Sequence, residues 1–226
     1  GTGGEVYTEG EVANFRNFLK GLNLDGFISR DEVAYKNFHD LFPISYNGID
    51  CAFFLGDCFE AIPLTIKNFV VYNFDNRPEP QIDQTNPQIL RTHHTCNELL
   101  FKPAGMPKFS LAFHRRWSFA EKFQWKNPFL RYLSQPNTLI SGMPDDYLHL
   151  YANVSAVYTD RVHACISTLA FGNAAMLYSK TPRAHLFERV GAGAIYQRLT
   201  RLDMERLRQE KQKQIQALKG IIEGGK

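Results

Sequence analysis

The stretch Ala156-Val157-Tyr158-Thr159-Asp160-Arg161-Val162-His163-Ala164-Cys165-Ile166-Ser167-Thr168-Leu169-Ala170-Phe171-Gly172 decides the fold of this chain. It opens with a short β-type run and continues, after a charged turn, with apolar residues at helical spacing until a glycine. Another apolar run, residues 174–178, is typical of a buried strand. The succession predicts a strand, a helix and a second strand, which is the βαβ unit of a parallel sheet.

Arg161 and His163 fall at the turn between the predicted strand and the predicted helix. Backbone N–H groups and the positive end of the helix dipole are unpaired at a helix N-terminus, and they suit an anion. Ligands of parallel α/β sheets bind beyond the carboxyl ends of the strands, where both side chains are expected. Asp160 is a further candidate for lining this cleft. Its alternative interpretation is an N-cap that only satisfies backbone donors.

The rest of the chain alternates between helical and strand-like segments, which implies a parallel sheet with right-handed crossovers. Helices are predicted at residues 12–22, 31–41, 127–133 and 145–152, and strands at 26–29, 49–55, 69–74, 108–114 and 138–141. From residue 197 onward, charged and amide residues surround spaced Leu and Ile, which predicts a long amphipathic helix. The expected fold class is α/β, with a Rossmann-like parallel sheet flanked by helices and a long C-terminal helix.

Three segments in chain order carry a resemblance. They are Gly26-Phe27-Ile28-Ser29-Arg30-Asp31-Glu32-Val33-Ala34-Tyr35, Ile49-Asp50-Cys51-Ala52-Phe53-Phe54-Leu55, and the region 147–190 with its core Thr159-Asp160-Arg161-Val162-His163-Ala164. Their order and spacing resemble the polysaccharide pyruvyl transferase family, and the C-terminal region matches best. The first segment looks like that family's strand followed by an Arg-Asp-Glu helix start, and the second is similar to its Asp-Pro-Ala-Phe strand.

The resemblance implies a fold of two Rossmann-like halves, similar to that of GT-B glycosyltransferases. We expect a partial N-terminal lobe at residues 1–105, a C-terminal lobe at 106–192 and an amphipathic helix at 193–226. The N-terminal half is expected to be shortened, because Arg30 lies only 29 residues from the start of the chain.

The activity that the resemblance implies is transfer of the enolpyruvyl group of phosphoenolpyruvate onto sugar hydroxyls of a polysaccharide or glycan precursor, as a ketal. Arg30 and His163 match family positions associated with the phosphoenolpyruvate site, and Arg161 lies beside them. Arginine suits a carboxylate and a phosphate, and histidine is the natural proton carrier near neutral pH. His163 and Arg161 are therefore the expected catalytic residues, with phosphoenolpyruvate as a co-substrate and no other cofactor.

Arg30 also has a purely structural interpretation, because Ser29-Arg30-Asp31-Glu32 fits a capping box in which Ser29 caps and Glu32 reaches back. Further cleft candidates are His114, Arg115 and Arg116, which follow a predicted strand and are surrounded by aromatic residues. Arginine beside an aromatic face suits a sugar ring or a phosphate.

A metal site is not expected. Thr92-His93-His94-Thr95-Cys96 contains imidazole and thiol groups, but a structural zinc site needs four convergent ligands. No second Cys/His cluster of that kind occurs in the sequence. A solvated loop or helix face is the favoured interpretation of this segment.

Composition limits the remaining classes. The chain has 226 residues, of which 44% are hydrophobic and 22% charged, and a net charge of +3 gives little support to nucleic-acid binding. No stretch approaches the roughly 20 apolar residues of a membrane-spanning helix. We expect a soluble, cytoplasmic protein that acts on a sugar or glycan acceptor. Peripheral membrane association through the basic C-terminal helix, and self-association, stay open.

Two other functions stay open as alternatives to pyruvyl transfer. A GT-B-type nucleotide-sugar glycosyltransferase would share the architecture but needs a donor-binding carboxylate and nucleoside contacts. A non-catalytic sugar- or anion-binding module fits the short N-terminal side. Release of phosphate, release of a nucleoside diphosphate, and binding without turnover distinguish the three.

Overall fold

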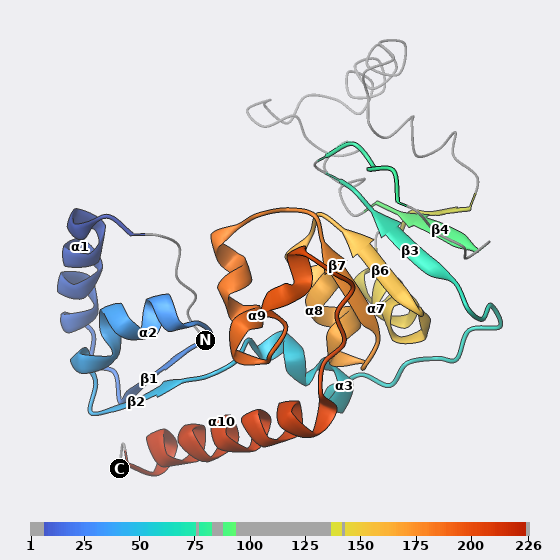
Figure 1. The fold of residues 1–226 in the computed structure, drawn as a ribbon. Helices are drawn as coiled ribbons and strands as arrows, with labels where there is room; N and C mark the ends of the chain where they lie inside the picture. Colours follow the sequence, from blue (N-terminus) through green and yellow to red (C-terminus); the bar gives the residue numbers. More distant parts are fainter. Residues whose placement is uncertain (1–6, 76, 83–87, 94–136, 142, 225–226) are drawn as a thin grey trace, which may run out of the picture.

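The computed structural model describes residues 7–75, 77–82, 88–93, 137–141 and 143–224, and their strands form two parallel sheets (Figure 1). The smaller sheet pairs β1 (Gly26–Ser29) with β2 (Ile44–Asn47). The larger sheet contains β3 (Val70–Asn73), β4 (Ile89–Thr92), β5 (Thr138–Leu139), β6 (Ala156–Thr159) and β7 (Ala174–Leu177). The helices are α1 (Glu9–Lys20), α2 (Glu32–Phe38), α3 (Leu55–Cys58), α7 (Pro144–Asn153), α8 (Val162–Ala170), α9 (Leu186–Arg189) and α10 (Met204–Gly224).

The larger sheet has the order β5-β4-β3-β6-β7, and every neighbouring pair is parallel. Numbered along the chain, this order is 3-2-1-4-5, which matches the first five strands of a Rossmann-like sheet. The order reverses between β3 and β6, so their carboxyl ends form the switch point where such sheets bind ligands. The predicted α/β class with a parallel sheet flanked by helices is confirmed.

The core of the larger sheet lies under α7 and α8. Val71 and Val157 are fully buried and pack against Leu150 and Tyr151 of α7. Next to them, Ile166 and Leu169 of α8 pack against Ala175 and Leu177 of β7. α8 ends at Ala170, and Gly172 follows with a φ of +80°, a left-handed conformation that favours glycine, while its N–H donates to Leu169 O. The βαβ unit predicted at 156–178 is therefore confirmed.

The smaller sheet has a core of its own. Phe27 of β1 packs with Ala34 and Phe38 of α2, and α1 covers the same cluster through Val12 and Leu19. The predicted helix at 31–41 is confirmed as α2 followed by a 3-10 turn at His39–Leu41. The cap of α2 differs from the predicted capping box. Asp31, not Ser29, is the N-cap, and its carboxylate accepts a hydrogen bond from Ala34 N.

The prediction of a strand at residues 49–55 is wrong. It forms the 3-10 helix η2 (Cys51–Phe54) and the start of α3, and the strand lies just before it, at Ile44–Asn47. Asp50 explains the difference, because its carboxylate accepts a hydrogen bond from Ala52 N and caps the helical turn. The buried Phe53 still points into the core, packed against Phe187.

The predicted boundary after residue 105 does not separate two sheets. It assigns β3 and β4 to one lobe and β6 to the other, but β3 pairs with β6 from Val70↔Ala156 to Asn73↔Thr159. The sheets instead divide between β2 and β3. The predicted strand at 108–114 and helix at 127–133 lie outside the described residues.

The C-terminal helix begins at Met204, later than the predicted 193. Residues Gly193–Tyr196 form the 3-10 helix η4, and Thr200 makes an isolated bridge to Ala175 at the edge of the larger sheet. α10 then runs below the two sheets (Figure 1). Its buried Gln214 accepts a hydrogen bond from Ile49 N, and its buried Lys211 pairs with Asp57 at 2.6 Å. The helix thereby links the segment after β2 to the rest of the molecule.

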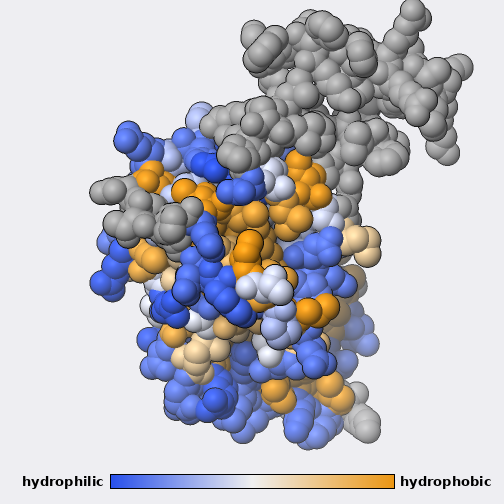
Figure 2. Space-filling model, turned by 90° about the vertical axis from the view of Figure 1, so that its right-hand side faces the viewer, coloured by the Kyte–Doolittle hydropathy of each residue, from blue (hydrophilic) through white to orange (hydrophobic). Residues whose placement is uncertain are grey.

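Hydrophilic residues cover most of the face shown in Figure 2, with apolar residues gathered toward its middle. None of the helices in the described part of the chain is both long and apolar enough to cross a membrane.

Candidate functional site

The site begins at the turn between β6 and α8, on the switch point of the larger sheet. Arg161 is the N-cap residue of α8, and no side chain of the described residues caps the helix there. Thr159 Oγ1 instead accepts a hydrogen bond from Arg161 N, at 2.9 Å. Asp160, considered above as an N-cap, is not the N-cap residue, and its Oδ1 accepts from Asp75 N at 3.2 Å. The residues at the start of α8 line a pocket.

A pocket of about 430 Å³ lies at this helix start, lined by Asp160, Arg161, Val162, His163, Ser179, Thr181 and Arg183. It joins the end of β6 to the segment after β7, where Thr181 caps the 3-10 helix η3 (Pro182–His185). Two guanidiniums, an imidazole and one carboxylate line the pocket next to the positive end of α8, and Arg161 is also paired with Asp75 behind it. Hydroxyls at Ser179 and Thr181 supply further hydrogen bonds.

Arg30 lies within electrostatic reach of this pocket, although it comes from the other sheet. Its Nη1 pairs with Asp50 Oδ2 at 3.0 Å. Both residues act on His163, Asp50 by stabilising its charged form and Arg30 by destabilising it. Arg161 and His163 both line the pocket, whereas Arg30 is not among its lining residues and acts on His163 only through its charge.

The pKa of His163 is lowered, first by desolvation and then by the positive charges of Arg161, Arg30 and Arg183. The negative charge of Asp50 opposes this shift. His163 keeps an exposed surface, but the atoms packed around its ring favour the neutral imidazole. A bound phosphate next to the ring would reverse this preference.

Behind the pocket lies a buried polar network at the ends of β3, β4 and β6. The Asp75 side chain is fully buried, and its Oδ2 accepts from Arg161 Nη1 at 2.7 Å. Its Oδ1 contacts His93 Nδ1 and accepts from Asn73 Nδ2 at 3.2 Å. Asn73 Oδ1 in turn accepts from Thr159 Oγ1 at 2.9 Å. The network connects the carboxyl ends of three neighbouring strands.

Sequence reasoning missed most of this network. The sequence predicts that His93 lies on a solvated loop or helix face, but it is buried, and Tyr147 Oη donates to its backbone carbonyl at 2.7 Å. Asn73 and Asp75 belong to no sequence motif. One feature of the sequence could have indicated them, because Asn73, Asp75 and His93 lie at or just after the ends of strands that a parallel sheet brings to one edge.

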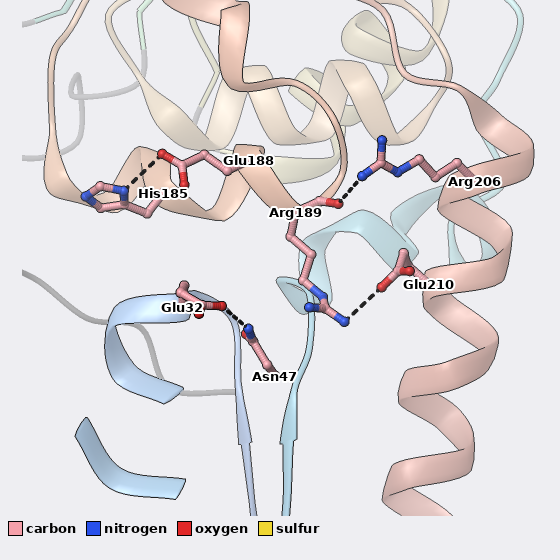
Figure 3. A pocket seen from close by; sticks show the side chains of 7 residues that line it. All are labelled: Glu32, Asn47, His185, Glu188, Arg189, Arg206 and Glu210. Atoms are coloured by element: carbon pink, nitrogen blue, oxygen red, sulfur yellow. Dashed lines mark hydrogen bonds and ion pairs between the residues drawn. The ribbon is translucent and has the colours of Figure 1, made fainter. Parts of the chain in front are cut away.

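A second pocket, of about 360 Å³, lies where the smaller sheet meets α9 and α10 (Figure 3). It is lined by Glu32, Asn47, His185, Glu188, Arg189, Arg206 and Glu210. Asn47 Nδ2 donates to Glu32, and Arg189 pairs with Glu210 at 3.1 Å. On the opposite wall, His185 Nδ1 contacts Glu188 at 3.2 Å. The lining mixes carboxylates, guanidiniums, an amide and an imidazole, and carries no large excess of either charge.

The remaining predicted cleft residues His114, Arg115 and Arg116 lie outside the described residues. Within the residues that are described, no group of three His, Cys, Asp or Glu side chains could hold a metal ion. Comparison with family models, with curated proteins and with solved structures found no match for this chain.

Proposed function

We propose that the chain carries the donor site of a phosphoenolpyruvate-dependent pyruvyl transferase. The observation that supports this most is the pocket at the start of α8, where Arg161, His163 and Arg183 meet at the switch point of a parallel sheet. Phosphoenolpyruvate carries a phosphate and a carboxylate, and both groups suit guanidiniums and a helix N-terminus. The resemblance of residues 147–190 to the pyruvyl transferase family supports the same donor.

The proposed reaction converts two acceptor hydroxyls and phosphoenolpyruvate into a cyclic ketal and inorganic phosphate. A proton adds to the CH₂ carbon, which becomes the methyl group, and the first hydroxyl oxygen bonds to the neighbouring carbon. The bond from that carbon to the phosphate oxygen then breaks, and the second hydroxyl oxygen takes its place. Of the two hydroxyl protons, one is balanced by the new methyl hydrogen and the other leaves with the phosphate.

His163 is the proposed proton carrier in this sequence. Its imidazole is held neutral in the free protein, so binding of the donor phosphate would raise its pKa and charge the acid where it is needed. General acid-base help of this kind is worth roughly 100- to 10,000-fold in rate. Arg161 and Arg183 would stabilise the departing phosphate, and Arg30, next to Asp50, would complete the positive field.

The acceptor is proposed to bind in the second pocket. All seven of its lining side chains end in planar polar groups, which together donate and accept hydrogen bonds. Neighbouring sugar hydroxyls also do both, whereas the mixed charge favours neither a strong anion nor a strong cation. Arg183 of the donor pocket and His185 of the second pocket lie on the same turn, η3. Both pockets therefore border this turn, and the proposed acceptor would have to reach the donor past it.

A GT-B-like arrangement is part of the proposal. The smaller sheet supplies Arg30 and Asn47 from the carboxyl ends of β1 and β2, and the larger sheet supplies Arg161 from the end of β6. Residues from two parallel sheets thus approach one region, as they do in two-lobed transferases. A nucleotide-sugar transferase would use the same arrangement, and the experiment below separates the two donors.

The test is ligand-dependent thermal stability of the purified chain with phosphoenolpyruvate, inorganic phosphate and UDP-glucose, for the wild type and Arg161→Ala. A ligand at 100 times its Kd stabilises the native state by about 2.7 kcal/mol. We expect phosphoenolpyruvate to stabilise the wild type more than phosphate does, and the effect of phosphoenolpyruvate to be smaller, though still measurable, in the variant. Arg208→Ala is the matched control, because Arg208 is an exposed arginine paired with Glu205 on α10.

Turnover is then followed as phosphate release and as a new ketal methyl signal in the NMR spectrum of a methyl hexopyranoside acceptor. Stabilisation by UDP-glucose alone would contradict the proposal and favour glycosyl transfer. If the chain binds both phosphoenolpyruvate and the acceptor but releases no phosphate, a non-catalytic module is favoured.

A further inference from the structure

Arg161 is held at two points, one on its backbone and one on its side chain. Its backbone N–H donates to Thr159 Oγ1 at 2.9 Å, and its Nη1 donates to Asp75 Oδ2 at 2.7 Å. Asn73 joins the two holding groups, since its Oδ1 accepts from Thr159 Oγ1 and its Nδ2 donates to Asp75 Oδ1. The orientation of the arginine is thus tied to the ends of both strands at the switch point.

The two side chains of the ion pair between Arg161 and Asp75 differ in their exposure to solvent. The Asp75 side chain is fully shielded from solvent, whereas 31% of the Arg161 side chain is exposed and lines the pocket. A buried carboxylate is costly unless it is paired and hydrogen-bonded, so the position of Asp75 depends on its partners. In return, a fixed carboxylate restricts the otherwise flexible side chain of Arg161.

The partners of Asp75 fix the carboxylate in turn. His93 Nδ1 contacts Oδ1 from the end of β4, and Asn73 Nδ2 donates to Oδ1 and also to Thr92 O, at 3.0 Å. Asp75 N donates to Asp160 Oδ1 at 3.2 Å. These contacts come from β3, β4 and β6, so the carboxylate cannot follow Arg161 if the arginine moves.

We propose that Asp75 is a positioning residue, which holds the Arg161 guanidinium at the start of α8 so that it meets the phosphate of an incoming ligand already oriented. The proposal rests on the proposed function for the identity of that ligand. Orientation before binding removes an ordering cost from the binding step. Asp75 itself touches no ligand, because its side chain has no exposed surface.

Charge alone predicts the opposite effect of Asp75 on anion binding. A carboxylate next to Arg161 neutralises part of its charge, so its removal could strengthen anion binding. Positioning and charge neutralisation therefore predict changes of opposite sign for Asp75→Asn, which keeps the shape and a hydrogen-bond acceptor but removes the charge.

The experiment is a double-mutant cycle on phosphoenolpyruvate affinity, measured by calorimetry for the wild type, Asp75→Asn, Arg161→Ala and the double variant. We expect Asp75→Asn to weaken binding about 10-fold, as loss of a charge-assisted hydrogen bond does. In the Arg161→Ala background we expect the same substitution to change the Kd by less than about 2-fold. A residue with a merely structural role would weaken binding in both backgrounds. Tighter binding by Asp75→Asn, or equal loss in both backgrounds, overturns the proposal.

A second measurement needs neither ligand nor a variant of Asp75. Nitrogen-15 NMR of the arginine side chains in the wild type, with Arg161 assigned through Arg161→Ala, reports rotation of each guanidinium. We expect restricted rotation at Arg161 and free rotation at the exposed Arg208. Free rotation at Arg161 overturns positioning by Asp75, whether or not phosphoenolpyruvate binds. Absence of phosphoenolpyruvate binding with restricted rotation contradicts the proposed function alone.

Discussion

His163 is the titratable side chain on which the proposed chemistry depends. Desolvation and the charges of Arg161, Arg30 and Arg183 lower its pKa, while Asp50 opposes the shift. In the free protein, we expect the His163 ring to titrate below the usual value of about 6.5. Phosphoenolpyruvate should raise this pKa, so that binding near pH 6 takes up a proton. The measurement is a proton NMR titration of the histidine rings with and without phosphoenolpyruvate.

The lowered pKa of His163 also determines the direction in which the stability of the protein changes with pH. Because the folded-state pKa lies below the unfolded one, the unfolded chain binds the proton more readily. The contribution of His163 to stability is complete above about pH 6.5 and falls as the pH drops through the lowered pKa. His163→Gln should therefore flatten the loss of stability between pH 7 and 5. A steeper loss in this variant would contradict the assigned direction.

Cys165 offers a separate residue-scale prediction. Burial raises the pKa of its thiol, whereas Cys51 and Cys58 are exposed. Only the thiolate reacts with alkylating agents, so Cys165 should stay unmodified in the native protein. We expect iodoacetamide at pH 8 to label Cys51 and Cys58 within minutes and Cys165 only after denaturation. Peptide mass spectrometry checks this, and native labelling of Cys165 would show that α8 opens.

At this scale the sequence predicts the residues of the pocket better than those behind it. Arg161 and His163 are recognisable because one turn carries them between a strand and a helix. Asp75 and Arg161 lie 86 residues apart, and His93 lies 18 residues from Asp75. Their contact depends on β3 lying between β4 and β6, and this order does not follow from local periodicity.

Gly56 of α3 lies close to the last residue of α8. A Cβ added at Gly56 would lie 2.7 Å from the backbone oxygen of Ala170. Because a backbone atom cannot swing aside, we expect Gly56→Ala to destabilise the protein by about 1–3 kcal/mol. Gly10→Ala on α1 is the control. It meets nothing within 4 Å, so it should be stabilising by about 0.5–1 kcal/mol. Urea unfolding of both variants measures the difference.

Elements with a clear period are predictable from this sequence, and short apolar runs are not. α1, α2, α7 and α8 follow helical spacing, and β1, β3 and β6 follow short apolar runs bounded by turn residues. The run at 49–55 reads equally well as a strand or a helix. The outcome is decided by Asp50, which caps η2 locally, and by the pairing of β2 with β1, which depends on tertiary context.

The described residues form two parallel sheets, and α10 contacts both the segment after β2 and the core beneath the larger sheet. A two-stranded sheet is marginal by itself, even with the small core of Phe27, Ala34 and Phe38. Phe53 of η2 and Leu207 of α10 both enter the core beneath the larger sheet. The smaller sheet therefore owes part of its order to the C-terminal helix, although more than 150 residues separate them in sequence.

The contact between Gln214 and Ile49 tests this dependence. Gln214 Oε1 accepts from the buried Ile49 N–H at 2.6 Å, directly after β2. Gln214→Ala leaves that donor unpaired, at a cost of about 1–3 kcal/mol, and the cost should fall on the smaller sheet because the larger sheet keeps all its contacts. We expect hydrogen exchange, followed by mass spectrometry, to accelerate at residues 26–50 and to stay unchanged at 156–177. Gln212→Ala, at an exposed position on the same helix, should change neither region. Equal acceleration in both regions would mean that the two sheets unfold as one unit and that α10 stabilises them jointly.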